Sequence, residues 1–261
     1  MWYELGARRI VLSRELSLRE IGEIRRNIPE DLELEGFAHG AMCVSHSGRC
    51  LLSDYFAARG ANRGNCAHTC RWKYALVEEK RPGEYWPIGE TDTGTFILNS
   101  RDLNMIRHLP EMLYAGIHSF KIEGRVKSDY YVAAITAAYR RALDACMESL
   151  DDYTQRADEF YADTEKVSHR AYTTGFYFGN PGADGQEYGS ASYVRDWEVC
   201  ALVRGYDTMR SLTECEQRNR FFEGEELEAL YPGGEPFVFR VGAIFDETGA
   251  RIPATTHAAM K

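Results

Sequence analysis

The sequence predicts an α/β domain followed by a small antiparallel β domain, and three observations support this fold class. Over residues 1–150, short apolar runs alternate with segments of helical periodicity, as in parallel βα units. Residues 151–167 are acidic and aromatic, which predicts a linker or a helix. Over residues 168–261, short β-rich segments are separated by Gly- and Pro-containing turns, as in a small barrel or sandwich.

The first helix has a clear start signal. Ser17 precedes a segment of helical periodicity, and Glu20 three residues later completes a capping box. The helices expected in the first domain span 17–27, 103–115 and 128–149. The strands expected there span 9–13, 32–39, 95–99 and 119–123. In the second domain, strands are expected at 172–178, 193–203, 226–230 and 237–241.

Four βα units amount to half of a TIM-like (β/α)8 barrel, which typically takes about 250 residues. Half a barrel leaves edge strands with unpaired backbone N–H and C=O groups, and such strands promote aggregation of an isolated chain. We therefore expect residues 1–150 to be the C-terminal half of a barrel, completed by a partner chain or by a missing N-terminal half. Of these two explanations we favour N-terminal truncation, and we expect the antiparallel β-barrel domain to be incomplete as well.

The charge balance argues against a generic nucleic-acid-binding protein. The chain has 31 Lys and Arg against 40 Asp and Glu, a formal net charge of −9. Residues 59–81 depart from this average, because six Lys or Arg and two Glu lie there with aromatic neighbours. Such a segment can bind phosphates and stack on bases, although a solvated loop is the simpler explanation. Its candidate RNA-binding residues are Arg59, Arg63, Arg71, Trp72 and Lys73.

The seven cysteines favour metal or redox use over disulfides. Residues 1–9 carry charges where a signal peptide is apolar, and no apolar run approaches the roughly 18 residues of a membrane span. We therefore expect a cytoplasmic protein without a membrane partner, and disulfides are rare in the cytoplasm. Four cysteines have the spacing C-x6-C-x15-C-x3-C, which matches no zinc finger or zinc ribbon.

These four cysteines are candidate metal ligands. Thiolates suit zinc or iron–sulfur clusters, and irregular spacing on a loop favours a 4Fe–4S cluster over zinc. The alternative is that some are merely buried thiols, which is our expectation for the three cysteines elsewhere in the chain. The candidate ligands are Cys43, Cys50, Cys66 and Cys70.

The expected strand at 119–123 carries charges that suit an active site. Lys121 and Glu123 share one face of the strand, and Arg125 follows it. At the carboxyl end of a barrel strand these side chains would face the active site, but a structural ion pair explains them equally well. His39 is a candidate general base, or else a buried core histidine. The sequence contains neither G-x-S-x-G nor H-E-x-x-H.

A long motif resembles the signature of the collagenase-like peptidases, family thirty-two of the peptidases of unknown type. The motif reads EGFAHGAMCVSHSGRCLLS at 35–53. Further matches follow in the expected order: NRGNC at 62–66, CRW at 70–72 and FKIEGR at 120–125. Two stretches resemble the tRNA 5-hydroxyuridine branch of the family: EEKRPGEY at 78–85 and SHRAYTTGFY at 168–177.

Despite its name, this family is associated mainly with oxygen-independent hydroxylation of tRNA, ribosomal RNA or a ubiquinone precursor. The resemblance implies a 4Fe–4S cluster on the four clustered cysteines and a barrel-mouth site at Lys121, Glu123 and Arg125. In the tRNA branch the target is the wobble uridine, and prephenate is implicated as the hydroxyl source.

We therefore expect a partial tRNA hydroxylase whose β domain helps to hold the RNA. The resemblance also implies that roughly a hundred or more residues usually precede the position of Met1. Three alternatives stay open: a protease, as the family name says; a hydroxylase of ribosomal RNA or of a ubiquinone precursor; and a non-catalytic RNA-binding fragment.

Overall fold

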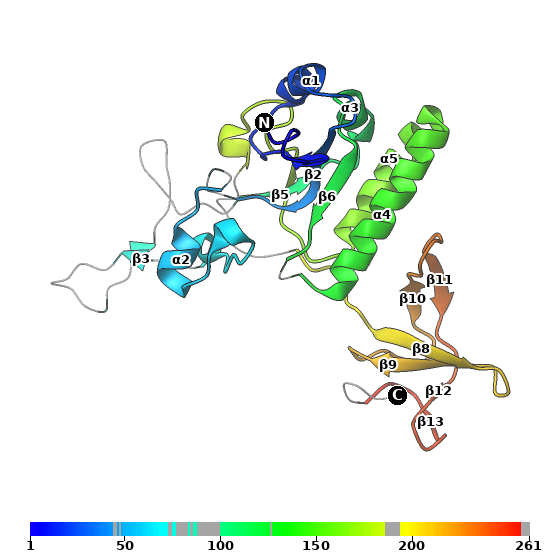
Figure 1. Cartoon of the computed structure of the whole chain (residues 1–261). Coiled ribbons are helices and arrows are strands. Elements are labelled where there is room, and N and C mark those ends of the chain that lie inside the picture. Colours follow the sequence, from blue (N-terminus) through cyan, green and yellow to red (C-terminus); the bar gives the residue numbers. More distant parts are fainter. Residues whose placement is uncertain are drawn as a thin grey trace.

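The computed structural model describes residues 1–43, 46, 48–72, 75–76, 83, 86–87, 100–125, 127–185 and 194–256. Figure 1 shows how its helices and strands are arranged. The helices are α1 (Leu18–Arg26), α2 (Leu52–Ala57), α3 (Leu109–Tyr114), α4 (Asp129–Glu148) and α5 (Leu150–Glu165), with short 3-10 helices η1 (Ala61–Arg63), η2 (Thr69–Arg71) and η3 (Gly182–Gly185). The strands are β1 (Arg9–Val11), β2 (Glu33–Ala41), β3 (Ala75–Leu76), β4 (Trp86–Pro87), β5 (Asp102–Asn104), β6 (Ser119–Glu123), β7 (Tyr172–Thr173), β8 (Ala201–Asp207), β9 (Leu212–Gln217), β10 (Glu226–Ala229), β11 (Phe237–Arg240), β12 (Ile244–Phe245) and β13 (Arg251–Ile252). None of the helices described has the length and apolar character needed to cross a membrane.

A five-stranded mixed sheet forms the centre of the N-terminal part. Strands β1 and β6 both pair in parallel with β2, as expected for βα units. Strand β5 instead pairs antiparallel with β2, and β7 pairs in parallel with β5. The α/β class is therefore confirmed. The strands of the described residues form an open sheet and not a closed barrel, so the barrel stays a prediction.

Several boundaries differ from those expected. The helix expected over 103–115 is limited to α3, because residues 102–104 form β5 and Pro110 occupies the first turn of the helix. Strand β7 belongs to the main sheet and not to the β domain, because it pairs with β5. Strand β8 begins eight residues later than the strand expected from residue 193. The strand expected over 95–99 lies outside the described residues.

The helices expected at 17–27 and 128–149 are confirmed. Ser17 and Glu20 form the predicted capping box at α1, with the Ser17 N–H donating to Glu20 Oε2 at 2.8 Å. The acidic stretch 151–167 is mostly helix α5, which packs alongside α4 (Figure 1). Both helices are tied to the sheet region by buried phenols, because Tyr139 donates to the Ala38 carbonyl and Tyr153 to the Ile106 carbonyl, each at 2.7 Å.

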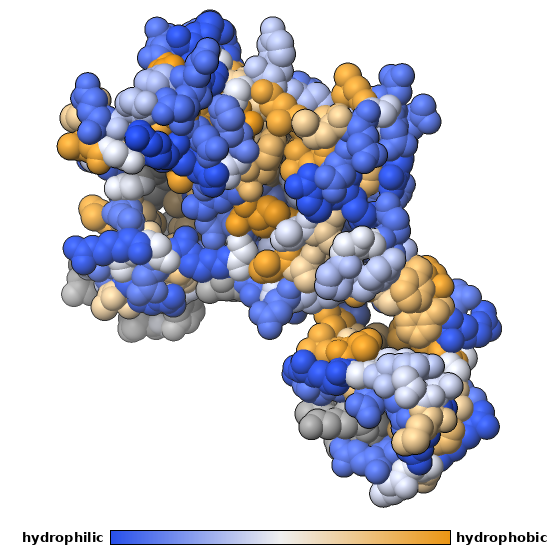
Figure 2. Space-filling view, turned by 45° about the vertical axis from the view of Figure 1, so that its right-hand side comes forward, coloured by the Kyte–Doolittle hydropathy of each residue, from blue (hydrophilic) through white to orange (hydrophobic). Residues whose placement is uncertain are grey.

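The C-terminal part consists of three antiparallel hairpins, β8–β9, β10–β11 and β12–β13, which are separate sheets among the described residues. Ion pairs connect these hairpins to the long helices: Glu235 with Arg141 and Arg156, and Glu228 with Lys166. Figure 2 shows the C-terminal part as a smaller lobe with apolar side chains on its surface. Small antiparallel sheets are therefore confirmed, and a barrel in this part is not.

A β-bulge divides strand β2 into two halves that face differently. Phe37 pairs with Lys121 of β6, but the next pair is His39 with Ile122, so Ala38 is the extra residue. Because side chains alternate along a strand, the bulge places His39 on the face of Ile122, which packs against the core, and not on the face of Lys121.

His39 is consequently enclosed by aromatic rings. Its side chain is fully buried, and its ring centroid lies 5.3 Å from that of Tyr172, 5.4 Å from that of Tyr139 and 6.0 Å from that of Tyr131. Burial lowers the pKa of His39 from 6.5 to about 3, against the opposing effect of the Asp102 carboxylate. The imidazole is therefore neutral near pH 7.

Replacing Gly40 with alanine should destabilise the fold. Gly40 has φ +113°, and a Cβ atom there would lie 2.4 Å from the Glu123 carbonyl oxygen. We expect Gly40→Ala to lower the free energy of unfolding by about 3 kcal/mol, measured by urea denaturation. Gly22→Ala is the matched control, because the new Cβ would make an ordinary 3.6 Å contact within α1. The free energy of unfolding of this control should rise by roughly 0.5–1 kcal/mol. Equal stability of Gly40→Ala and wild type would contradict the close approach of β2 and β6.

The buried imidazole predicts acid sensitivity. Below pH 6.5 His39 becomes protonated in the unfolded chain, whereas in the folded chain it stays neutral down to about pH 3. Because the unfolded state binds more protons in this range, the contribution of His39 lowers the free energy of unfolding as the pH falls. The maximum slope is about 1.4 kcal/mol per pH unit. His39→Leu should flatten the dependence of unfolding free energy on pH between about 6 and 4, measured by urea titrations, whereas the half-buried control His108→Gln should keep it. An unchanged slope in His39→Leu would contradict the buried neutral state.

Candidate functional site

The four clustered cysteines lie on one segment that leaves the carboxyl end of β2. Cys43 follows β2 by two residues, Cys50 precedes α2, Cys66 follows η1 and Cys70 lies in η2. None of the four forms a disulfide, and all four are partly buried. As a donor set they suit an iron–sulfur cluster, which binds thiolates. Within the described part of the chain, however, no three His, Cys, Asp or Glu side chains are arranged to hold a metal ion. The ligand set stays a prediction.

Side-chain hydrogen bonds hold this segment together. The Asn62 amide accepts from the Cys50 N–H at 3.0 Å and donates to the Cys50 carbonyl at 2.9 Å. The buried Ser53 hydroxyl accepts from the Ala67 N–H at 2.9 Å. Arg125, just beyond β6, donates to the Gly64 carbonyl. Cys50 and Cys66 are thus carried by one small folded unit that is attached to the end of β6.

A cluster of charged side chains lies at the edge of the sheet where β1, β2 and β6 end. Arg14 Nη2 lies 3.2 Å from Glu123 Oε2, and Arg125 Nη2 lies 3.6 Å from the same oxygen. The Arg14 guanidinium and the Lys121 ammonium both lie over the Phe37 ring, at 3.8 and 4.8 Å from its centroid. The structure therefore brings together the three predicted residues Lys121, Glu123 and Arg125.

Arg14 is the residue of this cluster that we did not anticipate. Its side chain is only 16% exposed, and burial lowers its pKa, while the Glu123 carboxylate, and the Cys43 thiol when it is ionised, favour the charged form. Arg14 therefore interacts electrostatically both with Glu123 of the charged cluster and with Cys43, the first of the clustered cysteines. Its position just past the first expected strand was a usable signal, because active-site residues of α/β barrels follow the strands.

His39 does not join this cluster. The bulge at Ala38 places it on the opposite face of the sheet, where it is buried among tyrosines. An imidazole with a pKa of about 3 is a poor general base near neutral pH. The structure thus favours the core-histidine alternative.

A cavity of about 120 Å³ opens beside Cys43. It lies where β2 and β7 end and where the antiparallel β5 begins, so segments distant in the sequence meet there. Among its residues only Cys43 was a candidate site residue, although Met42, Thr173 and Phe176 lie in the motifs that carry the family resemblance. The described residues that line it are Met42, Cys43, Ser100, Thr173, Gly175, Phe176, Asn180, Pro181, Gly182 and Gly185.

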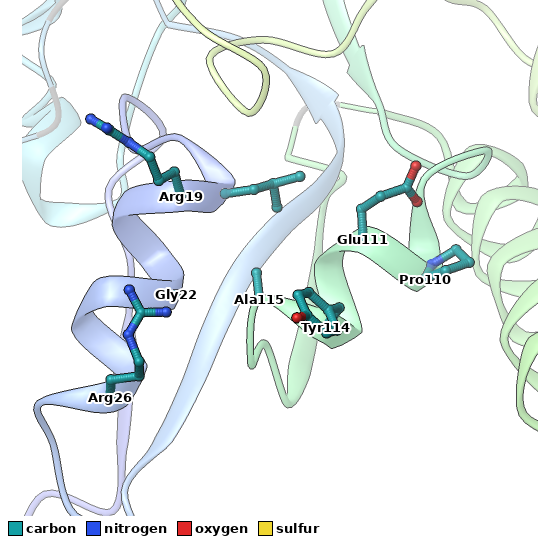
Figure 3. Close-up of a pocket in the computed structure, with 8 residues that line it drawn as sticks. Arg19, Gly22, Arg26, Pro110, Glu111, Tyr114 and Ala115 are labelled. Carbon is teal, nitrogen blue, oxygen red and sulfur yellow. The ribbon is translucent and has the colours of Figure 1, made fainter.

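A larger groove of about 460 Å³ lies between α1 and α3 (Figure 3). Arg19 and Arg26 come from one wall, and Glu111 and Tyr114 from the other. It contains none of the cysteines, and no residue of the charged cluster lines it. We therefore regard the smaller cavity beside Cys43 as part of the candidate site.

The predicted RNA-binding residues are partly described. Arg63 is exposed, Arg59 is half-buried and donates to Asn65 Oδ1 at 2.9 Å, and Trp72 is 48% exposed. The side chain of Arg71 and the whole of Lys73 lie outside the described part. An exposed ring nearby was missed: Tyr55 of α2 is 83% exposed.

Comparisons with known proteins agree with the resemblance. The tRNA hydroxylation protein P1 of Bacillus subtilis is 37% identical over 256 residues, which cover 98% of this chain and 60% of that protein. The tRNA hydroxylation protein P of Escherichia coli is 35% identical over 89% of this chain and 59% of its own length. The 23S rRNA 5-hydroxycytidine C2501 synthase of Escherichia coli is 38% identical over 66% of this chain and 26% of its own length.

The chain therefore spans about 60% of the length of the first two relatives. Family models match almost all of it. The model described as peptidase family U32 matches residues 1–187, and the model described as the peptidase family U32 C-terminal domain matches residues 195–261. The motif at 35–53, the four clustered cysteines and the charged strand end all lie within the first match. The chain belongs to peptidase family U32.

Proposed function

We propose that this chain is part of an RNA hydroxylase that converts the wobble uridine of tRNA to 5-hydroxyuridine. The observation that carries the proposal is that Cys43, the first of the four clustered cysteines, lines a small cavity at the edge of the sheet near the charged cluster. Relatives named for tRNA hydroxylation support this substrate, and the relative named for 5-hydroxycytidine synthesis supports a pyrimidine in RNA as the target class.

In this proposal Cys43, Cys50, Cys66 and Cys70 hold a 4Fe–4S cluster, which supplies one-electron chemistry when bound. Four thiolates are anionic, and the buried guanidinium of Arg14, which interacts electrostatically with Cys43, would offset part of that charge. Lys121 and Arg125 would orient an anionic hydroxyl donor, for which prephenate is our candidate.

The family name also raises the alternative that the protein is a protease. A peptidase needs an activated nucleophile or a catalytic zinc site, and the sequence lacks the G-x-S-x-G and H-E-x-x-H motifs. The buried, neutral His39 is poorly suited to activate a nucleophile. Cleavage of gelatin that survives loss of Cys43 and Cys50 would support the protease and contradict the hydroxylase.

Loss of the clustered cysteines should abolish cluster assembly. After anaerobic reconstitution, we expect about four iron and four sulfide per chain, and less than half of that in Cys43→Ser and Cys50→Ser. Cys215→Ser is the control, because this thiol lies in β9 and outside the cluster segment. A wild-type chain that binds no iron would contradict the cluster.

The substrate has a separate test. We expect tRNA from a strain lacking the gene to lose 5-hydroxyuridine derivatives in nucleoside mass spectrometry, and the wild-type gene, but not its Cys43→Ser variant, to restore them. Unchanged 5-hydroxyuridine in the deletion strain would contradict the tRNA assignment, whatever the iron content.

The exposed Arg63 should contribute electrostatically to RNA binding. Each phosphate contact on a single strand adds about 0.7 to the slope of log affinity against log salt concentration. Arg63→Ala should lower both the affinity and this slope, by about 0.7, in fluorescence titrations with a tRNA anticodon stem-loop. Arg210→Ala, which removes an exposed arginine from the β8–β9 turn, is the control. A slope that falls only in the control would contradict RNA binding by this segment.

A further inference from the structure

The cavity beside Cys43 has walls of two kinds. Met42 and Phe176 contribute apolar surface, while Ser100, Thr173 and Asn180 contribute polar groups. Apart from the Cys43 thiol, none of the described lining side chains can carry a charge. Such a site suits a neutral ligand better than a phosphate or a carboxylate, which would need a nearby cation.

Two lining side chains have their acceptor atoms engaged, which leaves hydrogens for a ligand. Asn180 Oδ1 accepts from the Gly182 N–H at 3.0 Å, an arrangement that assigns the Nδ2 amide as the donor end. Thr173 Oγ1 accepts from the Gly175 N–H at 3.2 Å, so its hydroxyl hydrogen remains for another acceptor. The preferred ligand is therefore neutral and bears acceptors such as ring carbonyls.

The size of the cavity limits the ligand further. Its volume of about 120 Å³ is close to the roughly 150 Å³ of a protein cavity that holds one benzene ring. A single six-membered ring fits this space, whereas the fused rings of a purine need more. A pyrimidine meets all three requirements, because it is one neutral ring with carbonyl acceptors.

We propose that this cavity receives a pyrimidine base, flipped out of an RNA loop, with Thr173 and Asn180 donating to its carbonyl oxygens. Enzymes that modify a base commonly extrude it into such a pocket, and the cost is small when the base is already single-stranded. Cys43, the first predicted cluster ligand, lines the same cavity, so the base would lie next to the proposed redox group. This inference rests on the proposed RNA hydroxylase function.

The test compares RNA stem-loops that differ only at the target nucleotide. One carries uridine, one an abasic site and one adenosine, and their dissociation constants with the full chain are measured by fluorescence anisotropy. We expect the wild type to prefer uridine over the other two by roughly tenfold. Thr173→Val and Asn180→Asp should reduce this preference to roughly threefold or less. Thr208→Val, in the exposed β8–β9 turn, should retain it.

The outcomes separate the pocket from the proposed function. Equal binding of uridine and abasic loops by the wild type would overturn the base pocket while leaving RNA binding intact. No binding of any loop would overturn the proposed function, and the pocket with it. Competition by free uridine monophosphate as strong as that of the loop would identify a nucleotide site and overturn base flipping.

Cross-linking tests the pocket without any variant. RNA with 4-thiouridine at the target position is irradiated with the wild-type chain, and the linked peptide is identified by mass spectrometry. We expect the links to fall at residues 42–43 or 173–182. Links confined to other segments would overturn the pocket even if the variants fail to fold.

Discussion

The candidate site depends on the close pairing of β2 with β6. Gly40 lies so near the Glu123 backbone that no side chain fits between them, and the bulge at Ala38 lies two residues before this contact. Together they decide which side chains face which way: Phe37, Lys121 and Glu123 face one side, whereas His39 and Ile122 face the other. Without the bulge, the imidazole would join the charged cluster and Phe37 would stay where it is. The core beneath α4 would then lose the ring around which three tyrosines pack.

The edge of the sheet at Cys43 carries both a cluster of charged side chains and a cavity lined by neutral ones. Arg14, which pairs with Glu123, interacts electrostatically with Cys43, and Cys43 also lines a cavity whose other described side chains cannot carry a charge. Charged groups hold their orientation when they are paired, as Arg14 and Glu123 are, and so cost less to bury. A neutral cavity beside them is suited to a base whose phosphates bind elsewhere. Cys43 is the residue common to both environments.

Local signals predicted local structure well. The capping box at Ser17, the long helix α4 and the strand β6 follow from spacing and composition, and the residues of the charged strand end were identified by their alternation. The failures are nonlocal. The bulge at Ala38 has no signature of its own, because an alanine inserted between Phe37 and His39 looks like any strand residue. The pairing of β5, antiparallel with β2 and parallel with β7, brings Ser100 near Met42 and Thr173, and it is a matter of register between distant segments. Therefore the charged residues could be predicted, and the cavity could not.

The distribution of charge bears on which part of the chain would face RNA in the proposed function. Residues 48–72, which carry three of the four clustered cysteines, include four arginines and a single aspartate. Residues 195–256, the C-terminal hairpins, include seven arginines against twelve aspartates and glutamates.

Phosphate binding is dominated by Lys and Arg, and like charges repel over about 8–10 Å at physiological salt. The hairpins therefore repel a polyanion on average, which argues against our expectation that they help to hold RNA. Their exposed apolar side chains, such as Val203 and Val238, suit a protein contact better. In the proposed function, an RNA loop bound at the arginine-rich segment would lie near the edge of the sheet that carries Cys43 and the neutral cavity. A net charge of −9 is thus compatible with RNA modification, because it is a whole-chain average and residues 48–72 have a positive balance.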